Sequence, residues 1–473
     1  MAARSDLIIV GMGSGGMVAA EFAATLGVKV VVVERDRVGG DCLWTGCVPS
    51  KALLASAKAA HTMRHADRYG LSPCEPRIDT SRVFKRVRDV QARIAAADDN
   101  AARFEAMGIE FRFGPARLTG PRTVRVGEGD STEELEARFI LLCTGSRPAV
   151  PPIPGLREAG FLTSETLWDL LEAPASLISI GGGPIAVELS QAFTRLGVPT
   201  TLLERERGIL EKDEPELVDT LVARLRDEGV VLELGAQLES VAVQDGMKVV
   251  HGTVGGEQRE WRAADILLGA GREPNVEDLG LEDAGVEVNA RGVVVDDAYR
   301  TSVKSVYAAG DVAGRWLFTH AAGYEASRAV RNMFFPGSAS GPFLVPWCTF
   351  TDPELAHAGL TVAQAHERHG QDAVQVWRMG LDHSDRARAD SAGDGAIVLV
   401  AAKGKLVGAH ALAPAAGELI NELAVAIQNG TKLADLASVV HVYPTLAIAI
   451  QQLAGEAAFE GAAKYRWLVR SVA

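Results

Sequence analysis

Residues 39–51 read Gly39-Gly40-Asp41-Cys42-Leu43-Trp44-Thr45-Gly46-Cys47-Val48-Pro49-Ser50-Lys51 and carry the strongest chemical signal in the chain. An Ala- and Leu-rich helix is predicted from Lys51 to about His61. A disulfide between Cys42 and Cys47 would close a short ring, and the start of a helix can bring the two Cα atoms within bonding range. Cys47 would lie in the first turn, where the positive end of the helix dipole lowers the pKa of a thiol. We interpret the pair as a redox couple; the plainer alternative is two buried cysteines that happen to be near each other.

The residues before the cysteines follow the pattern of a dinucleotide-binding βαβ unit. Leu7–Val10 is an apolar run that indicates a buried strand, and a helix at 17–26 and a second strand at 28–33 follow. Three glycines at G-x-G-x-x-G spacing separate the first strand from the helix, namely Gly11, Gly13 and Gly16. These glycines let the backbone approach a pyrophosphate at the helix N-terminus, and the carboxylate of Glu34 takes ribose hydroxyls.

The same construction returns in the middle of the chain. A strand at 177–180 leads into a turn with Gly181 and Gly183, a helix at 187–196 follows, and a second strand at 200–203 ends at Glu204. The first glycine and the acid are 23 positions apart in both copies. Two such units predict two dinucleotides, one bound permanently and one that exchanges.

Cys-x4-Cys followed by Val-Pro-Ser-Lys, after a nucleotide-binding unit, resembles the redox centre of the class I pyridine nucleotide-disulfide oxidoreductases. This family includes glutathione reductase, lipoamide dehydrogenase and mercuric reductase, and the chain looks most like the mercuric-reductase branch. The resemblance covers nearly the whole chain. It implies an α/β fold with two Rossmann-like domains, for FAD and NAD(P), and a C-terminal α+β dimerisation domain. The implied boundaries are 1–147 and 274–344 for the FAD-binding domain, 148–273 for the NAD(P)-binding domain and 345–473 for dimerisation.

The family pattern also implies further cofactor residues. The turns that contain Thr144, Gly145 and Gly271 lead the chain out of the flavin domain and back into it. Asp311 would lie on the ribityl chain of FAD, with Gly310 allowing close approach. Thr319 and His320 would open a helix that faces the flavin pyrimidine; the plainer alternative is a helix-capping Thr319 with a surface His320.

The resemblance implies a route for electrons from a nicotinamide to FAD and then to a Cys42–Cys47 disulfide. Cys47 would be the flavin-side sulfur, which forms a thiolate charge-transfer complex, and Cys42 the interchange thiol that attacks the outside substrate. Lys51 would reach flavin N5 with Glu188 as its partner, unless it is simply a solvated helix lysine. Glu204 favours NADH, whereas Arg205, Arg207 and Ala186 in the third glycine position are features that suit NADPH.

The C-terminal part predicts an antiparallel sheet, from alternating runs at 396–401 and 406–411, with helices on one side. It departs from the family at the acid–base dyad that serves the partner subunit's thiol. Tyr443 stands in the His position and Ile448 in the Glu position, which leaves Tyr443 as a candidate catalytic residue and His441 as a candidate substitute base. Mercuric reductase also has Tyr there, but the residues Arg470-Ser471-Val472-Ala473 lack that enzyme's C-terminal cysteine pair.

Three smaller departures lie near the predicted flavin and redox sites. Asp41 replaces the usual Thr, and Leu43, Trp44 and Thr45 are a bulkier filling between the cysteines than the small residues common in the family. Pro184 stands where glutathione reductase has an aromatic gate over the flavin, so nicotinamide access is expected to differ.

Composition narrows the classes of function. The 473 residues allow several domains, and the net charge of −13 argues against nucleic acid or an anionic membrane surface as partner. No apolar run reaches the ~18 residues of a membrane span. Five cysteines in so long a chain do not make a secreted disulfide scaffold. We therefore expect a cytoplasmic protein, and the resemblance to the family implies a homodimer.

The leading hypothesis is an FAD enzyme that passes electrons from NAD(P)H to a disulfide or other soft small-molecule acceptor, with no metal cofactor. One alternative is a quinone or metal-ion reductase in which electrons leave the flavin directly. Another is a redox-sensing FAD/NAD-binding protein with little turnover. The fold and redox centre are shared across many substrates, so the sequence does not name the acceptor.

Overall fold

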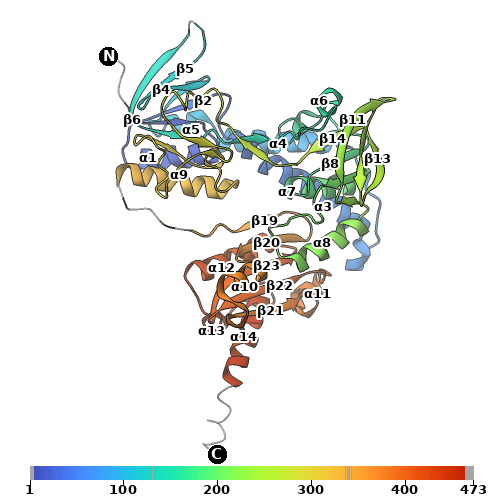
Figure 1. Ribbon diagram of the computed structural model, residues 1–473. Helices are drawn as coiled ribbons and strands as arrows, with labels where there is room; N and C mark the ends of the chain where they lie inside the picture. Colours follow the sequence, from blue (N-terminus) through green and yellow to red (C-terminus); the bar gives the residue numbers. More distant parts are fainter. Residues whose placement is uncertain (1–4, 130, 336, 338–340, 342, 464–473) are drawn as a thin grey trace, which may run out of the picture.

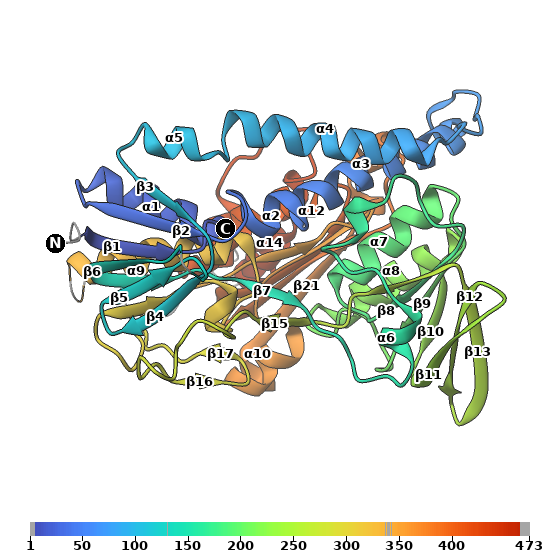
Figure 2. The same cartoon turned by 90° about the horizontal axis from the view of Figure 1, so that it is seen from above.

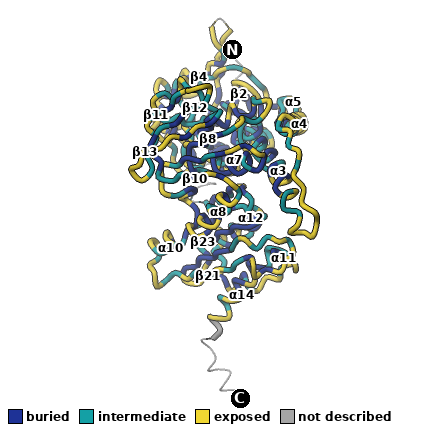
Figure 3. The backbone as a smooth tube through the Cα atoms, turned by 90° about the vertical axis from the view of Figure 1, so that its right-hand side faces the viewer, coloured by how far each residue is buried: buried dark blue, intermediate teal, exposed yellow. Residues whose placement is uncertain are grey.

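The computed structural model describes residues 5–463 except 130, 336, 338–340 and 342. Figure 1 shows two α/β bodies side by side, the first around strands β2 (Val30–Glu34) and β6 (Glu133–Leu142) and the second around strand β8 (Leu177–Ile180). Below them lies a third body that carries the strands from β19 (Trp347–Thr349) to β23 (Lys405–Ala413). Figure 3 shows buried segments gathered inside the bodies and exposed segments on their outer loops. Among the described residues, no helix is both long and apolar enough to cross a membrane.

The first body is built on a seven-stranded sheet in the order β3-β2-β1-β6-β5-β4, with β18 also paired to β6. Its parallel strands are β1 (Ser5–Val10), β2 (Val30–Glu34), β3 (Glu110–Phe113), β6 (Glu133–Leu142) and β18 (Val306–Ala308). The antiparallel strands β4 (Ala116–Gly120) and β5 (Thr123–Val126) extend the sheet beside the first half of β6. Helices α1 (Ser14–Thr25) and α9 (Thr319–Phe334) pack against each other below it (Figure 1).

Helix α1 begins three residues before the predicted position 17, because Gly15 and Gly16 of the glycine turn already belong to the helix. Position 16 requires a glycine, because a Cβ there would collide with the carbonyl oxygen of Gly11. Strand β1 is almost wholly buried, as the apolar run indicated.

The second body repeats this plan around a four-stranded parallel sheet in the order β10-β9-β8-β14. Its elements are β8 (Leu177–Ile180), α7 (Pro184–Arg195), β9 (Thr200–Glu204), α8 (Pro215–Asp227), β10 (Val231–Leu234) and β14 (Asp265–Leu268). An antiparallel meander, β11 (Gln237–Gln244), β12 (Met247–Val254) and β13 (Glu257–Ala263), packs beside it. The chain enters and leaves this body through two short antiparallel strands, β7 (Ser146–Pro148) and β15 (Arg272–Pro274).

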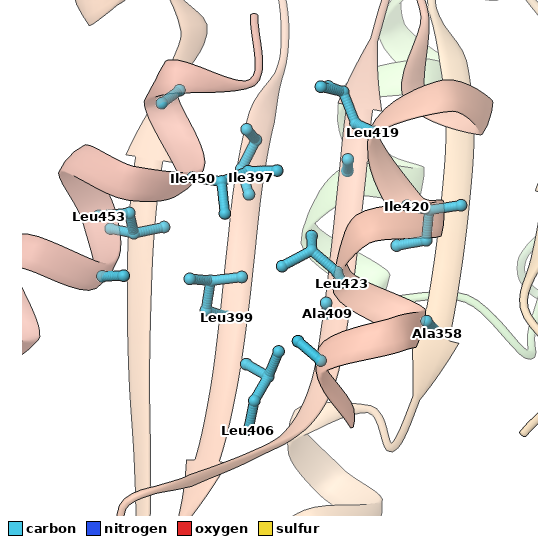
Figure 4. Packing of buried hydrophobic residues seen from close by; sticks show 14 of the residues in the cluster. Ala358, Ile397, Leu399, Leu406, Ala409, Leu419, Ile420, Leu423, Ile450 and Leu453 are labelled. Atoms are coloured by element: carbon cyan, nitrogen blue, oxygen red, sulfur yellow. The ribbon is translucent and has the colours of Figure 1, made fainter. Parts of the chain in front are cut away.

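The third body is a five-stranded antiparallel sheet in the order β19-β20-β23-β22-β21. The strands are β19 (Trp347–Thr349), β20 (Glu354–Gly359), β21 (Val374–Gly380), β22 (Ala396–Ala402) and β23 (Lys405–Ala413). Helices α12 (Ala416–Gln428), α13 (Leu433–Ala437) and α14 (Ile448–Ala463) cover one face. Figure 4 shows Leu423 of α12 and Ile450 of α14 pointing toward Leu399 of the sheet. Each such buried side chain contributes about 1.5–3 kcal/mol.

The expectation of helices on one side only is wrong, because the other face of this sheet is covered as well. Val398, Val400 and Leu412 point away from α12 and pack in one cluster with α8 of the second body and with α10 (Val362–His369). Strand β22 is therefore buried on both faces, which explains why it is apolar at every position instead of alternating.

The redox segment forms two consecutive helices, α2 (Gly40–Trp44) and α3 (Cys47–Arg64). Helix α3 is longer than predicted at both ends and starts at the second cysteine, since Pro49 fits a first turn whose N–H groups have no partner. Figure 2 shows α3 and α4 (Thr80–Ala97) running side by side from the first body to the second. Smaller helices are α5 (Ala101–Glu105), α6 (Leu156–Ala159) and α11 (Asp385–Ala389).

A buried arginine joins the second and third bodies. Arg195 of α7 is 4% exposed; its Nε lies 2.7 Å from Oε2 of Glu228 and its Nη1 2.8 Å from Oδ2 of Asp352. The guanidinium bridges a buried carboxylate, Glu228, and a partly exposed one, Asp352, which also pair with Arg224 and Lys58, respectively. This network holds the entry to the third body against α7.

Replacing Arg195 with Met should destabilise the protein by about 1–3 kcal/mol, because Glu228 and Asp352 would lose their most buried partner and keep only Arg224 and Lys58. The measurement is the shift of the thermal and urea unfolding midpoints. The control is Lys85→Met, which removes the exposed Lys85–Asp89 pair and should change the stability by less than about 0.5 kcal/mol. Equal midpoints for the two variants would contradict the role given to Arg195.

Candidate active site

A continuous cavity of about 2100 Å³ runs through the first and second bodies. Both glycine turns, Cys42, Cys47 and the Lys51–Glu188 pair line it. Single ligand sites usually occupy ~300–1,000 Å³, so this cavity has room for more than one ligand.

The first glycine turn lies in close contact with neighbouring segments of the backbone. Gly11 has φ +96°, and a Cβ there would collide with the carbonyl oxygen of Cys143. A Cβ on Gly40 would lie 2.6 Å from Cα of Gly13, so the turn and the redox segment touch through two glycines. Glu34 accepts hydrogen bonds from the backbone N–H of Met12 at 2.6 Å and of Asp36 at 2.8 Å, which places its carboxylate beside the turn.

The second turn has the same construction. A Cβ on Gly181, at φ +118°, would lie 2.5 Å from the carbonyl oxygen of Gly269, and Gly183 precedes the first residue of α7. Glu204 accepts from the N–H of Glu206 at 2.8 Å. Ala186 fits in the third glycine position because the residue that faces it is Gly269. A Cβ on Gly269 would lie only 2.8 Å from the Cβ of Ala186.

Both cysteines of the redox segment are free thiols, and they differ in environment. A hydrogen bond from Cys42, the hydroxyl of Thr319 and the charge of Lys51 together lower the pKa of Cys47 to about 6, against the effect of burial. Donating that hydrogen bond, together with burial, raises the pKa of Cys42. The two environments therefore favour loss of the proton from Cys47 over loss from Cys42.

Thr319 is a site residue whose contact the sequence did not reveal. Its Oγ1 lies 3.3 Å from Sγ of Cys47, although 272 positions separate the two residues. The helix-capping alternative is wrong, because Phe318 is the N-cap residue of α9 and no side chain caps that helix. His320, on the same first turn, is exposed, and its Nε2 lies 2.8 Å from the carbonyl oxygen of Pro346.

The bulky filling of the redox segment serves to anchor it. Trp44 donates its indole N–H to the carbonyl of Val38 at 2.8 Å. Gln91 of α4 donates to the carbonyls of Leu43 and Trp44, and Trp168 donates to that of Thr45 at 2.9 Å. The anchors Gln91 and Trp168 carry no recognisable motif, so only the fold reveals them.

Lys51 is paired rather than simply solvated. Its Nζ lies 2.9 Å from Oε2 of Glu188, which is 4% exposed, and 4.4 Å from the ring centre of Phe350. The other oxygen of Glu188 accepts from the N–H of Phe350 at 2.8 Å. The carboxylate thus holds the ammonium group at the cavity wall.

The two predicted crossing turns and the Gly310–Asp311 segment meet in one polar network. Thr144 donates its hydroxyl to the carbonyl of Asn275 at 2.8 Å, next to Gly145 at φ +70°, and Gly271 has φ +120°. Asp311 accepts from the hydroxyl of Ser146 at 2.5 Å, and burial raises the pKa of Asp311.

Behind this network lies a carboxylate that the sequence analysis missed. Glu325 is fully buried and accepts from the N–H of Gly310 at 2.9 Å. Burial raises the pKa of Glu325 to about 7. It holds Gly310 in its left-handed conformation, at φ +77°.

The residues of the altered dyad are not brought to the cysteines within this chain. Tyr443 and His441 do not line the cavity that contains Cys42 and Cys47. Tyr443 is 62% exposed and donates its hydroxyl to Oδ2 of Asp385 at 3.0 Å, a contact that raises the pKa of Tyr443. Ile448 is the first residue of α14, and Arg470 to Ala473 lie outside the described residues.

His441 has both ring nitrogens beside acceptors. Nε2 lies 2.7 Å from Oε1 of Glu422 and Nδ1 lies 3.0 Å from the carbonyl oxygen of Val439. His441 lies away from both cysteines of this chain, so its role as a substitute base stays a prediction. Within the described residues, no group of three or more His, Cys, Asp or Glu side chains could hold a metal ion.

Cys47 should react with iodoacetamide before Cys42, with a rate that rises through a midpoint near pH 6, because the thiolate is the nucleophile. Cys42→Ala removes the hydrogen bond that stabilises the thiolate most, so the midpoint should move to higher pH. The measurement is the alkylation rate between pH 5 and pH 9 followed by mass spectrometry, with the exposed Cys74 replaced by Ala as the control. An unchanged midpoint in Cys42→Ala would show that Cys42 does not set the reactivity of Cys47.

Comparisons with known proteins agree with the geometry and confirm the resemblance. A model of the pyridine nucleotide-disulphide oxidoreductases matches residues 5–326, and one of their dimerisation domain matches 345–454.

Dihydrolipoyl dehydrogenase of Haloferax volcanii is 35% identical over 471 residues, covering 97% of each chain. Mercuric reductase of Bacillus cereus is 34% identical over 448 residues, covering 93% of this chain and 70% of that one. The solved Cu(II) complex of the HOCl-induced flavoprotein disulfide reductase RclA from Escherichia coli has a TM-score of 0.84 and 26% identity, with 96% and 99% coverage. The chain therefore belongs to the pyridine nucleotide-disulphide oxidoreductases, a family of enzymes that bind FAD and NAD(P)H.

Proposed function

We propose that the enzyme passes electrons from NADH through FAD to the Cys42–Cys47 pair and from there to a soft acceptor. The observation that carries this proposal is the asymmetry of the two cysteines, with a thiolate favoured at Cys47 and a proton at Cys42. FAD, when bound, supplies a ring that accepts a hydride and delivers two electrons. The glycine turns, in which Gly11, Gly16 and Gly181 leave no room for a Cβ, fit a dinucleotide that lies against the backbone.

We assign the roles of the protein's own residues as follows. Glu188 holds the ammonium group of Lys51 at the cavity wall, where it provides positive charge for a reduced flavin. Cys47 is the flavin-side sulfur, kept as a thiolate by Cys42, Thr319 and Lys51. Cys42 is the interchange thiol: it gives its proton to solvent and its sulfur bonds to the acceptor. Cys47 then attacks the sulfur of Cys42 to form the disulfide, and the bond from Cys42 to the acceptor breaks with its electron pair leaving on the acceptor, which is reduced by two electrons.

The replacement of the family's acid–base dyad by Tyr443 and Ile448 limits which acceptors the enzyme can reduce efficiently. Reduction of an ordinary disulfide requires a group that takes a proton from the attacking thiol and returns it to the leaving thiol. Tyr443 keeps its proton, since Asp385 raises its pKa, and Ile448 has no carboxylate. We therefore favour an acceptor that needs no protonated leaving thiol, such as a quinone or a soft metal ion. The Cu(II) bound by RclA is a precedent for a metal ion.

We also infer a cytoplasmic homodimer, since the matched dimerisation domain carries large exposed apolar side chains at Val440, Val442, Tyr443 and Phe459. The cytoplasm is where reduced nicotinamide nucleotides are supplied. We retain boundaries at 147/148, 273/274 and 344/345; the first two fall within the crossing strands β7 and β15.

Lipoamide and glutathione disulfide should be reduced slowly, and benzoquinone, Hg²⁺ or Cu²⁺ faster, in steady-state assays. Tyr443→Phe should leave lipoamide turnover nearly unchanged, whereas Tyr443→His combined with Ile448→Glu should raise it, within the ~10²–10⁴-fold that acid–base catalysis supplies. Wild-type lipoamide turnover on the order of hundreds per second, with a bell-shaped pH profile near 7, would contradict the acceptor proposal.

The same panel separates the alternatives when it is repeated with Cys42→Ser. Quinone or metal reduction that survives this substitution would show that electrons leave the flavin directly. Flavin reduction by the nicotinamide without turnover of any acceptor would indicate a redox sensor.

NADH should be preferred over NADPH, because Glu204 suits a ribose diol and repels a 2′-phosphate. Arg205 is 75% exposed and paired with Glu206, so it is not committed to a phosphate. The measurement is kcat/KM for both nucleotides, and Glu204→Ala should shift the ratio toward NADPH. A wild-type ratio above ten in favour of NADPH would reject the preference.

A further inference from the structure

We propose that Asp41 and Arg272 are a positioning pair that sets the charge balance of the Cys42–Cys47 centre from the crossing between the two nucleotide bodies. Nη2 of Arg272 lies 3.2 Å from Oδ2 of Asp41. The proposal rests on the role given above to Cys47. It concerns the residue at which the redox segment departs from the Thr expected by resemblance.

Asp41 closes the turn between the two cysteines. Its carbonyl accepts from the N–H groups of Thr45 at 2.8 Å and Gly46 at 2.6 Å, and its Oδ1 accepts from the hydroxyl of Thr45 at 2.5 Å. A Cβ on Gly46 would lie 3.1 Å from Oδ2 of Asp41, so the carboxylate packs directly on the backbone before Cys47. The charge of Asp41 is thus fixed close to the thiolate.

The side chain of Arg272 is held in place by contacts with the crossing strands. It belongs to β15, where it pairs with Pro148 of β7, and its side chain is 12% exposed. Its Nε donates to the hydroxyl of Ser146 at 2.7 Å and its Nη2 to the carbonyl of Ser146 at 3.0 Å. Nε also lies 3.6 Å from Oδ2 of Asp311. The guanidinium therefore connects the redox segment to the crossing strands.

Two opposing sets of charges act on Cys47. Lys51, paired with Glu188, lowers the pKa of Cys47, and the carboxylate of Asp41 raises it. Arg272 offsets the charge of Asp41, while Asp311 and Glu165 are further carboxyl groups near the guanidinium. Removing Asp41 or Arg272 must consequently move the thiolate titration in opposite directions.

The experiment titrates Cys47 in the two-electron-reduced holoenzyme by the long-wavelength absorbance of its thiolate beside the flavin. Asp41→Asn should lower the midpoint by roughly 0.5 pH unit, about a threefold change in thiolate below the midpoint, and Arg272→Gln should raise it by a similar amount. The double variant should lie between the two. Alkylation of Cys47 by iodoacetamide gives the same midpoints without any acceptor or turnover.

Charge-conserving variants and a matched control complete the test. Asp41→Glu and Arg272→Lys should stay within about 0.2 unit of the wild type, since each keeps its charge. Arg117→Gln removes the exposed Arg117–Asp283 pair of the same body and should shift nothing. If Arg272→Gln fails to retain FAD, the comparison of Asp41→Asn with Asp41→Glu still shows in which direction the charge of Asp41 shifts the Cys47 midpoint.

Shifts of the same sign in Asp41→Asn and Arg272→Gln would overturn the proposal, because they would report distortion of the turn instead of charge. Midpoints that do not move would overturn it too. Failure of the proposed function would give a different result, because the long-wavelength absorbance would then survive Cys47→Ser. In that case the pH midpoints of Cys47 alkylation would still show whether Asp41 and Arg272 act on this thiol.

Discussion

The carboxylate of Glu188 is the point at which the three bodies of the protein meet. It lies on α7 of the second body, accepts from Lys51 on the helix that follows the cysteines, and accepts from Phe350 at the entry to the third body. A carboxylate that is 4% exposed costs several kcal/mol unless it is paired and hydrogen-bonded. Its two oxygens have those partners only when all three bodies are in place. Assembly and the position of the ammonium group at the cavity wall therefore depend on the same contact.

Much of the fold could be predicted because its signals are local. The glycine turns and their acids, Glu34 and Glu204, follow from spacing along one βαβ unit, and so does the pairing of a helix start with Cys47. The contacts of the site could not be predicted in the same way. Thr319 approaches Cys47, and Trp168 approaches Thr45, across long separations in the sequence. The family pattern placed Thr319 at a helix start near the flavin but did not reveal its contact with Cys47, and Trp168 belongs to no recognisable motif.

The expectations that failed have a common cause, which is tertiary packing. The third body has helices on both faces because α8 of the second body covers the sheet from behind. Thr319 does not cap α9, since it is the first helical residue after the N-cap Phe318, and its hydroxyl lies 3.3 Å from Sγ of Cys47.

The position of β18 in the first sheet has a consequence for the growing chain on the ribosome. The second half of β6 pairs with β18, which is made about 160 residues later, after the whole second body. At translation speeds of ~5–20 residues per second, the slot beside β6 stays open for roughly 10–30 s. An unpaired strand edge is a template for wrong partners during that time. The second body, whose sheet uses only its own strands, can fold in the interval and shorten the distance that β18 must cross.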